Sequence, residues 1–179
     1  MCMKAISLQS GSSGNCIYVE TGGAKLLFDA GITGSQTEER LAAHGRDIRA
    51  VDAVIISHDH SDHIRHAGVL QRKYGLPVYV TPATFAAASA RCALGKMPDV
   101  RHFRSHDKLR FGEVIVHAIP TPHDGVDGSA FVVEASGKRL GIMTDLGHVF
   151  KDLIGVVASL DAVFLESNYD PDMLAHGPY

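Results

Sequence analysis

The chain of 179 residues carries a formal net charge of −3, with 45% hydrophobic and 21% charged residues. This length is typical of one domain with a sizeable core, and the composition excludes a disordered chain. The weak negative charge offers no general attraction to nucleic acid or to an anionic membrane, so a polyanionic substrate must be held by a local patch or by metal ions.

The cysteines and the N-terminus restrict the compartment. Three cysteines without CxxC spacing argue against a disulfide framework or a thiolate zinc site and favour a reducing compartment. The N-terminus lacks the apolar core of a signal peptide, and no apolar run approaches the ~20 residues that span a bilayer. We therefore expect a cytoplasmic protein with no membrane partner and no obligate protein partner.

Short β-like runs alternate with helical segments in the first half of the chain. Glycine- and serine-rich turns separate the first three runs, which predicts a meander of hairpins. Thr33 or Ser35 can cap the first helix, and Gly75 can end the second. Thr81 and Pro82 can begin the third helix. The expected strands cover residues 4–8, 16–20, 25–28, 53–56 and 78–80, and the expected helices cover 36–44, 64–74 and 82–94.

The second half of the chain returns to strands and contains one further helix. Basic side chains alternate along 102–110, which we interpret as the water-facing side of a hairpin in preference to a track for a nucleic-acid backbone. The order of elements predicts an α/β protein in which two sheets pack together with helices outside. The expected strands cover residues 100–104, 108–111, 113–119, 129–134, 138–143 and 162–165, and the expected helix covers 149–160.

A stretch with the sequence ISHDHSDHIRH, at 56–66, gathers four histidines behind a buried strand. A tetrahedral zinc site with an open position takes three protein ligands, whereas four candidates of suitable chemistry occur here, which favours two metals. These candidates are His58, His60, Asp62 and His63. We interpret Asp59 and Ser61, which lie between them, as residues that shape the loop. The alternative for the whole stretch is a solvated polar loop.

Two distant residues suit the same metal centre. His123 follows the expected strand 113–119, and Asp145 follows the expected strand 138–143. A carboxylate at a strand end can bridge two cations with its two oxygens. Each residue alone is weak support, because a single loop histidine is usually no ligand.

Together these motifs resemble the metallo-β-lactamase superfamily. The matching pieces are, in order, FDAG at 28–31, SHDHSDH at 57–63, TPHDG at 121–125 and TDLG at 144–147. The resemblance implies an αββα sandwich and a two-metal centre. By the same resemblance, the ligands of the first metal are His58, His60 and His123. The resemblance assigns Asp62 and His63 to the second metal and Asp145 as the ligand that bridges both. It also implies that Asp29 supports the site from beneath.

Finer features resemble the YycJ/WalJ-type branch of bacterial exonucleases. They are SGSSGNC at 10–16, IPTPHDG at 119–125 and FLESNYD at 164–170. This resemblance implies a cytoplasmic, metal-dependent enzyme that degrades DNA from the 5′ end. Asp145 stands where true β-lactamases carry a cysteine, which points away from lactam hydrolysis.

The expected mechanism is two-metal phosphodiester hydrolysis. Two cations, zinc or manganese, would lie about 3.5–4 Å apart and hold a hydroxide that attacks the phosphorus. Asp62 is the candidate catalytic residue that orients the hydroxide or accepts its proton. Ser12, Ser13 and Asn15 are candidate contacts to DNA or another phosphodiester, because successive N–H groups and small hydroxyls can form an anion nest. The alternative for their loop is an ordinary glycine-rich turn.

One departure from the superfamily concerns its C-terminal part. The superfamily completes the second metal site with a histidine on a late strand, and His176 does not match that position. We therefore expect residues 1–179 to form a single domain that lacks its C-terminal part, with an incomplete second site. Two other functions stay open. One is a glyoxalase-II-like thioesterase or other small-molecule hydrolase, and the other is a metal-binding fragment without catalysis.

Overall fold

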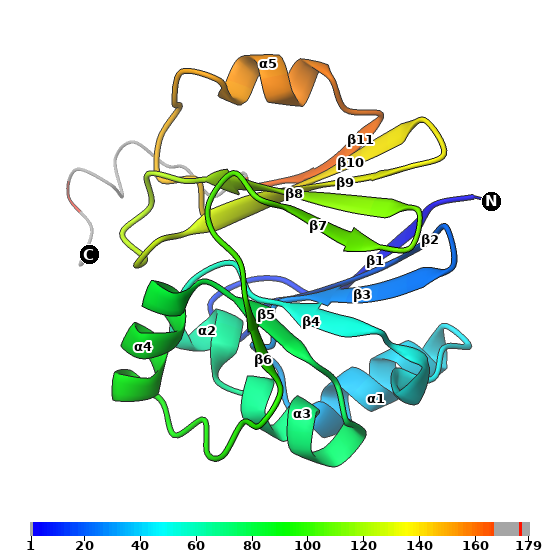
Figure 1. The fold of residues 1–179 in the computed structure, drawn as a ribbon, viewed down its shortest axis with the longest axis vertical. Helices are drawn as coiled ribbons and strands as arrows, with labels where there is room; N and C mark the ends of the chain where they lie inside the picture. The colour runs from blue at the N-terminus through cyan, green and yellow to red at the C-terminus, as the bar shows by residue number, and fades with distance from the viewer. Residues whose placement is uncertain (1, 167–175, 177–179) are drawn as a thin grey trace.

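The computed structural model describes residues 2–166 and residue 176 of the chain. Two β-sheets pack face to face, and helices cover the outer surface of each (Figure 1). The predicted αββα architecture is therefore confirmed.

One sheet carries the N-terminal half of the chain. Strands β1 to β3 form the predicted antiparallel meander, and β3 to β6 continue the sheet in parallel. In spatial order the strands are β1 (Lys4–Gln9), β2 (Cys16–Thr21), β3 (Ala24–Phe28), β4 (Ala53–Ile55), β5 (Val78–Val80) and β6 (Val100–His102). The helices on its outer face are α1 (Gly34–Ala43), α2 (Ser61–Ile64), α3 (Ala67–Tyr74) and α4 (Pro82–Arg91), with a 3-10 turn η1 (Ile48–Ala50).

The other sheet carries the C-terminal half. Strands β7 to β10 are antiparallel neighbours, and β11 joins β10 in parallel. The strands are β7 (Lys108–Phe111), β8 (Val114–Pro120), β9 (Ser129–Ala135), β10 (Lys138–Met143) and β11 (Ala162–Leu165). Helix α5 (Leu153–Ala158) covers its outer face (Figure 1). Among the helices of the described residues, none is both long and apolar enough to cross a membrane.

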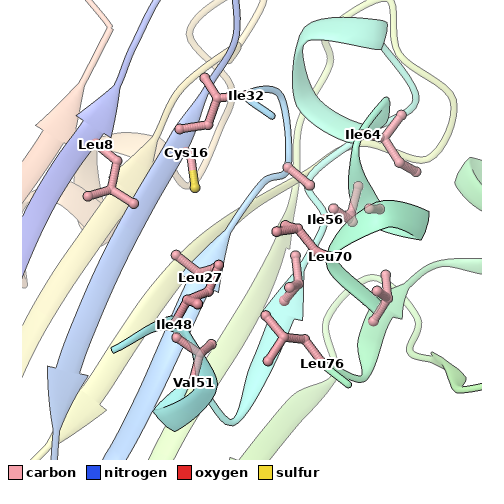
Figure 2. Close-up of a cluster of buried hydrophobic side chains, with 14 of the residues drawn as sticks. Leu8, Cys16, Leu27, Ile32, Ile48, Val51, Ile56, Ile64, Leu70 and Leu76 are labelled. Atoms are coloured by element: carbon pink, nitrogen blue, oxygen red, sulfur yellow. The ribbon is translucent and has the colours of Figure 1, made fainter. Parts of the chain in front are cut away.

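Strand periodicity divides the core into layers. Along β3, Leu26 and Phe28 face the second sheet, while Leu27 between them faces the helices, because successive side chains of a strand point to opposite faces. Phe28 packs on Phe131 of β9 with ring centroids 5.3 Å apart. Figure 2 shows the helix-facing layer, where Leu27 lies near Ile48. The central strands are thus buried on both faces, and their ends are fixed positions for a site.

Helix boundaries follow the predicted signals. Thr33, one of the two predicted caps, begins α1 with a capping box that includes Gln36. Gly75 ends α3 with φ of 73°, a left-handed conformation that favours glycine. Thr81 caps α4, and Pro82 occupies its first position.

The helix expected over 64–74 is confirmed only from Ala67 onward, as α3, and it is not continuous with α2. In a continuous helix the carbonyl of Asp62 would accept the N–H of His66. Here that carbonyl accepts the N–H of Asn15 at 2.8 Å, and His66 donates to the carbonyl of Ala30 at 3.0 Å. The segments around residues 15 and 30 therefore break the helix between Ile64 and Ala67. The helix expected over 149–160 is also shorter, since α5 spans only Leu153–Ala158.

The hairpin expected over 102–110 is wrong as well. β6 pairs with β5 in the first sheet, whereas β7 pairs with β8 in the second, so this stretch crosses between the sheets. Phe103 is buried at the crossing. The basic side chains consequently do not share one face of a hairpin.

Candidate metal centre

The histidine loop leaves the middle of the first sheet at the end of β4. β4 pairs in parallel with β3 and β5, and the chain stays buried from Ile56 to Asp59. α2 then begins at Ser61 with His60 as its N-cap. Regular structure on both sides therefore fixes the loop that the sequence singles out.

Three histidines bring ring nitrogens together on one side of this loop. Their ligand atoms all lie within 4.8 Å of one another. We call this set the histidine group: His58, His60 and His123. His123 comes from the segment between β8 and β9, and its Nε2 lies 3.3 Å from Nδ1 of His60. The rings of His58 and His123 meet edge to face, with centroids 5.0 Å apart.

A second set of ligand atoms lies beside the first. We call it the carboxylate group: His58, His63 and Asp145, whose ligand atoms also lie within 4.8 Å of one another. Nε2 of His63 lies 3.3 Å from Asp145 Oδ2 and 3.5 Å from Asp62 Oδ2. Asp62 thus adjoins this set through His63, while His58 takes part in both groups.

Asp29 holds the ring of His63 directly and the ring of His58 through Ser57. It follows β3 with φ of 66°, and its buried carboxylate accepts the Nδ1–H of His63 at 2.7 Å. Ser57 donates its backbone N–H and its hydroxyl to the same carboxylate at 2.8 and 2.9 Å. Because the Ser57 hydroxyl proton goes to Asp29, Ser57 Oγ accepts from His58 Nδ1, which lies 2.9 Å away. This network assigns the protons and leaves Nε2 of both histidines pointing into the site.

The two rings nevertheless differ in protonation. Burial, with the neighbouring histidines adding to it, lowers the pKa of His58 to about 2. Burial would also lower the pKa of His63, but the Asp29 carboxylate, with Asp62 and Asp145, outweighs it and raises that pKa to about 10. In the metal-free chain at neutral pH, His58 is therefore a neutral imidazole, whereas His63 is protonated on both ring nitrogens and carries a positive charge.

The donor chemistry fits divalent cations. Nε2 of His58 is buried and has no hydrogen-bond partner among the described residues, an arrangement that is unfavourable unless a ligand completes it. Nε2 of His63 faces two carboxylates, which require a positive charge between them, either a proton or a metal ion. Imidazole and carboxylate together suit zinc and manganese. Burial, with Asp29 adding to it, raises the pKa of the Cys16 thiol, and neither set of donor atoms among the described residues includes its sulfur.

Two glycines bring the loops of His123 and Asp145 against the centre. A Cβ on Gly125 would lie 2.8 Å from Cδ2 of the His58 ring. A Cβ on Gly147 would lie 2.8 Å from the carbonyl oxygen of Pro122 and 2.9 Å from the Cα of His123. The glycines of the TPHDG and TDLG motifs are therefore required by close approach.

The loop over 10–15 contacts the centre through Asn15. Asn15 Nδ2 lies 3.1 Å from Asp62 Oδ2 and 3.0 Å from His63 Nε2, and Asn15 Oδ1 accepts the N–H of Gly11 at 2.9 Å. The amide of Asn15 thus donates to Asp62 and supports this expected metal ligand, a role that sequence reasoning missed. Ser12 and Ser13 are exposed at the tip of the loop.

A cavity of about 580 Å³ opens on the carboxylate side of the centre. Its lining combines the carboxylates of Asp62 and Asp145 with polar residues of the loop over 10–15 and apolar residues of β11. Ser12, Asn15 and Glu166 are among its lining residues. The last four residues of the FLESNYD motif, 167–170, lie outside the described residues. The cavity is large enough for a small molecule or the end of a larger one.

Comparisons with known proteins agree with this geometry. The sequence model of the metallo-β-lactamase superfamily matches residues 10–172. The exodeoxyribonuclease WalJ of Streptococcus pneumoniae is 36% identical over 174 residues, and the exodeoxyribonuclease YycJ of Bacillus anthracis has the same identity over the same length. The alignments cover 96% of this chain and 65% of each relative, so the chain spans less than two thirds of their length. The expected likeness to the YycJ/WalJ type is confirmed.

A solved structure shares the fold at low sequence identity. A metallo-β-lactamase of Cronobacter sakazakii superposes with a TM-score of 0.66 and 19% identity, over 87% of this chain and 74% of that one. The match of the family model to most of the sequence and the shared sandwich lead to one conclusion. The chain belongs to the metallo-β-lactamase superfamily.

Proposed function

We propose that this chain carries the active centre of a metal-dependent exonuclease that degrades DNA from the 5′ end. The observation that carries the proposal is the pair of donor groups that share His58 beside a partly polar cavity. The two relatives named exodeoxyribonucleases support DNA as the substrate. The three cysteines, all within the described residues, are free thiols, which suits a cytoplasmic location.

In this proposal the two groups hold two divalent cations, zinc or manganese. The histidine group would hold the first cation, His63 and Asp62 would hold the second, and Asp145 would supply a further carboxylate to the centre. When bound, such cations supply positive charge for a phosphoryl oxygen and lower the pKa of a water molecule. They also provide local positive charge, which a chain with a net charge of −3 needs to hold a phosphate.

Asp62 is the proposed catalytic side chain. Burial works against its ionisation, but the hydrogen bond and charge of His63 lower the pKa of Asp62. Asp62 is therefore a carboxylate at neutral pH, and its oxygens can accept a hydrogen bond from the attacking water and orient it. Asn15 holds the same carboxylate through Nδ2. Ser12 at the rim of the cavity is a proposed phosphate contact, and so is neighbouring Ser13 in the same exposed loop.

The test is nucleotide release from linear DNA that carries a 5′-phosphate, with manganese or zinc added. We expect mononucleotides that disappear with a chelator, appear first from a 5′-labelled end, and fall strongly in His60→Ala and Asp62→Asn. A glutathione thioester and an RNA of the same sequence serve as parallel substrates. Thioester cleavage without nucleotide release would contradict the nuclease proposal and favour a small-molecule hydrolase.

A further inference from the structure

One fully buried carboxylate near the start of the histidine loop, Asp59, is neither a member of a donor group nor an expected metal ligand. Asp59 lies between His58 and His60, and its side chain is 0% exposed. A buried carboxylate is strongly unfavourable unless other groups compensate its charge and satisfy its oxygens. Its partners therefore show what this residue does.

Both oxygens of Asp59 have partners from other parts of the chain. Nη1 of Arg91, at the end of α4, lies 2.5 Å from Oδ2. The backbone N–H of Val126 donates to Oδ1 at 2.7 Å. Asp59 thus joins the histidine loop to α4 and to the segment between β8 and β9.

Val126 lies in the segment that delivers His123. Its N–H is held by Asp59, and its carbonyl accepts the hydroxyl of Thr84 of α4 at 2.6 Å. The preceding residue, Gly125, packs directly on the His58 ring. The backbone N–H and carbonyl of Val126 are consequently both held, three residues after His123 and next to a contact with His58.

We propose that Asp59, fixed by Arg91, is a positioning residue that sets the place of His123 and so the affinity and geometry of the first metal site. The inference rests on the proposed function, because it assumes that the histidine group holds a cation. Asp59 acts through the loop over 121–128 and touches neither the metal nor the substrate. Arg91 compensates the buried charge, and its side chain is 61% exposed, so its removal leaves little empty space.

The test is a cobalt titration of the chain, with affinity from chelator competition and geometry from the visible absorption of bound cobalt. In Asp59→Ala the first site should bind cobalt about tenfold or more weakly, as when an outer partner of a metal ligand is lost. Asp59→Asn keeps an acceptor for the Val126 N–H and should recover part of that affinity. Arg91→Gln should weaken binding less than Asp59→Ala, and its effect should be smaller still when combined with Asp59→Asn, because the two residues act as a pair.

The matched control is Asp99→Asn, which removes an Asp–Arg pair with Arg101 on the surface. It should leave cobalt binding unchanged. If Asp59→Ala does not fold, Asp59→Asn and Arg91→Gln carry the test. Unchanged first-site affinity and absorption in these folded variants, with normal binding in the unsubstituted chain, would overturn the positioning role alone. No cobalt binding by the unsubstituted chain would overturn the proposed function and this inference with it.

Discussion

The histidine group and the carboxylate group lie side by side and share His58. Within them, the pKa values of His58 and His63 are shifted in opposite directions. The pKa of His58 is lowered to about 2, mainly by burial among other histidines. The pKa of His63 is raised to about 10 by carboxylates that outweigh its burial. The same side chain, in two positions five residues apart, is thus neutral in one and charged in the other.

This difference determines how the histidine group and the carboxylate group can each bind a cation. The histidine group offers an unprotonated buried nitrogen on His58 and needs to lose no proton there. The carboxylate group already contains a positive charge on His63, so a cation must replace a proton. We therefore expect the two halves to respond differently to substitution and to pH.

The largest effect should come from the shared residue. His58→Ala removes the buried free ring nitrogen of the histidine group, so binding of the first cation should fall by about a hundredfold or more, at or beyond the effect of losing an outer partner of a metal ligand. His60→Ala removes a donor from the histidine group only and should leave the second cation less affected. Metal content after dialysis checks both. Equal losses at the two sites in His60→Ala would contradict the division into two groups.

Asp29→Asn should affect the carboxylate group more strongly. The amide keeps the size of the side chain but removes the charge that holds the proton on His63 Nδ1. We expect second-site affinity to fall about 10–100-fold. Competition with a chelator measures this change, and Ser57→Ala is the comparison, since it breaks the link from Asp29 to His58 instead. An equal loss of affinity at both sites in Asp29→Asn would contradict the expectation that Asp29 acts mainly on the carboxylate group.

The stability of the metal-free chain should fall at both ends of the pH range. The folded pKa of His63 is above its ordinary value of 6.5, so its contribution is full below that value and is lost as pH rises through about 10. The folded pKa of His58 is below 6.5, so stability is lost as pH falls from there toward about 2. Urea unfolding in chelator from pH 5 to 10.5 measures both slopes. His63→Gln should flatten the alkaline slope, and an unchanged slope would contradict the charge on His63.

Asn15→Ala should have the smallest effect of these substitutions. It removes the hydrogen bond to Asp62 and the two hydrogen bonds with the backbone of Gly11, with a loss of about 1 kcal/mol of stability per hydrogen bond. Second-site affinity should fall severalfold, while the histidine group is unaffected. Ser13→Ala, in the same loop, is the control for binding. If Ser13→Ala weakened the second cation as much as Asn15→Ala, the support by Asn15 would be excluded.

Local patterns predicted much of the fold. The capping residue Thr33 and the terminating Gly75 depend on neighbours in sequence, so their signals can be read without the structure. Strand β11 spans the predicted range over 162–165. The break between α2 and α3 could not be predicted, because it depends on backbone partners at Asn15 and Ala30 that are distant in sequence.

The same distinction applies to the candidate site. The spacing of His58, His60 and His63 within one loop indicated their proximity, and their order with later motifs indicated His123. The role of Asn15 depends on a partner 47 residues away, and the role of Asp59 on partners 32 and 67 residues away, which no local pattern reveals. The alternating basic residues over 102–110 misled for a related reason. Alternation indicates a strand but not the sheet that the strand joins.

Calorimetric titration of zinc into the chelator-stripped chain, in buffers of different ionisation enthalpy, tests the central claim most directly. It measures the number of cations and the protons released with each. We predict two binding steps at pH 7, a tighter one with little proton release from the histidine group and a weaker one that releases about one more proton, from His63. A single class of sites with the same proton release for every cation, or no binding, would contradict the account.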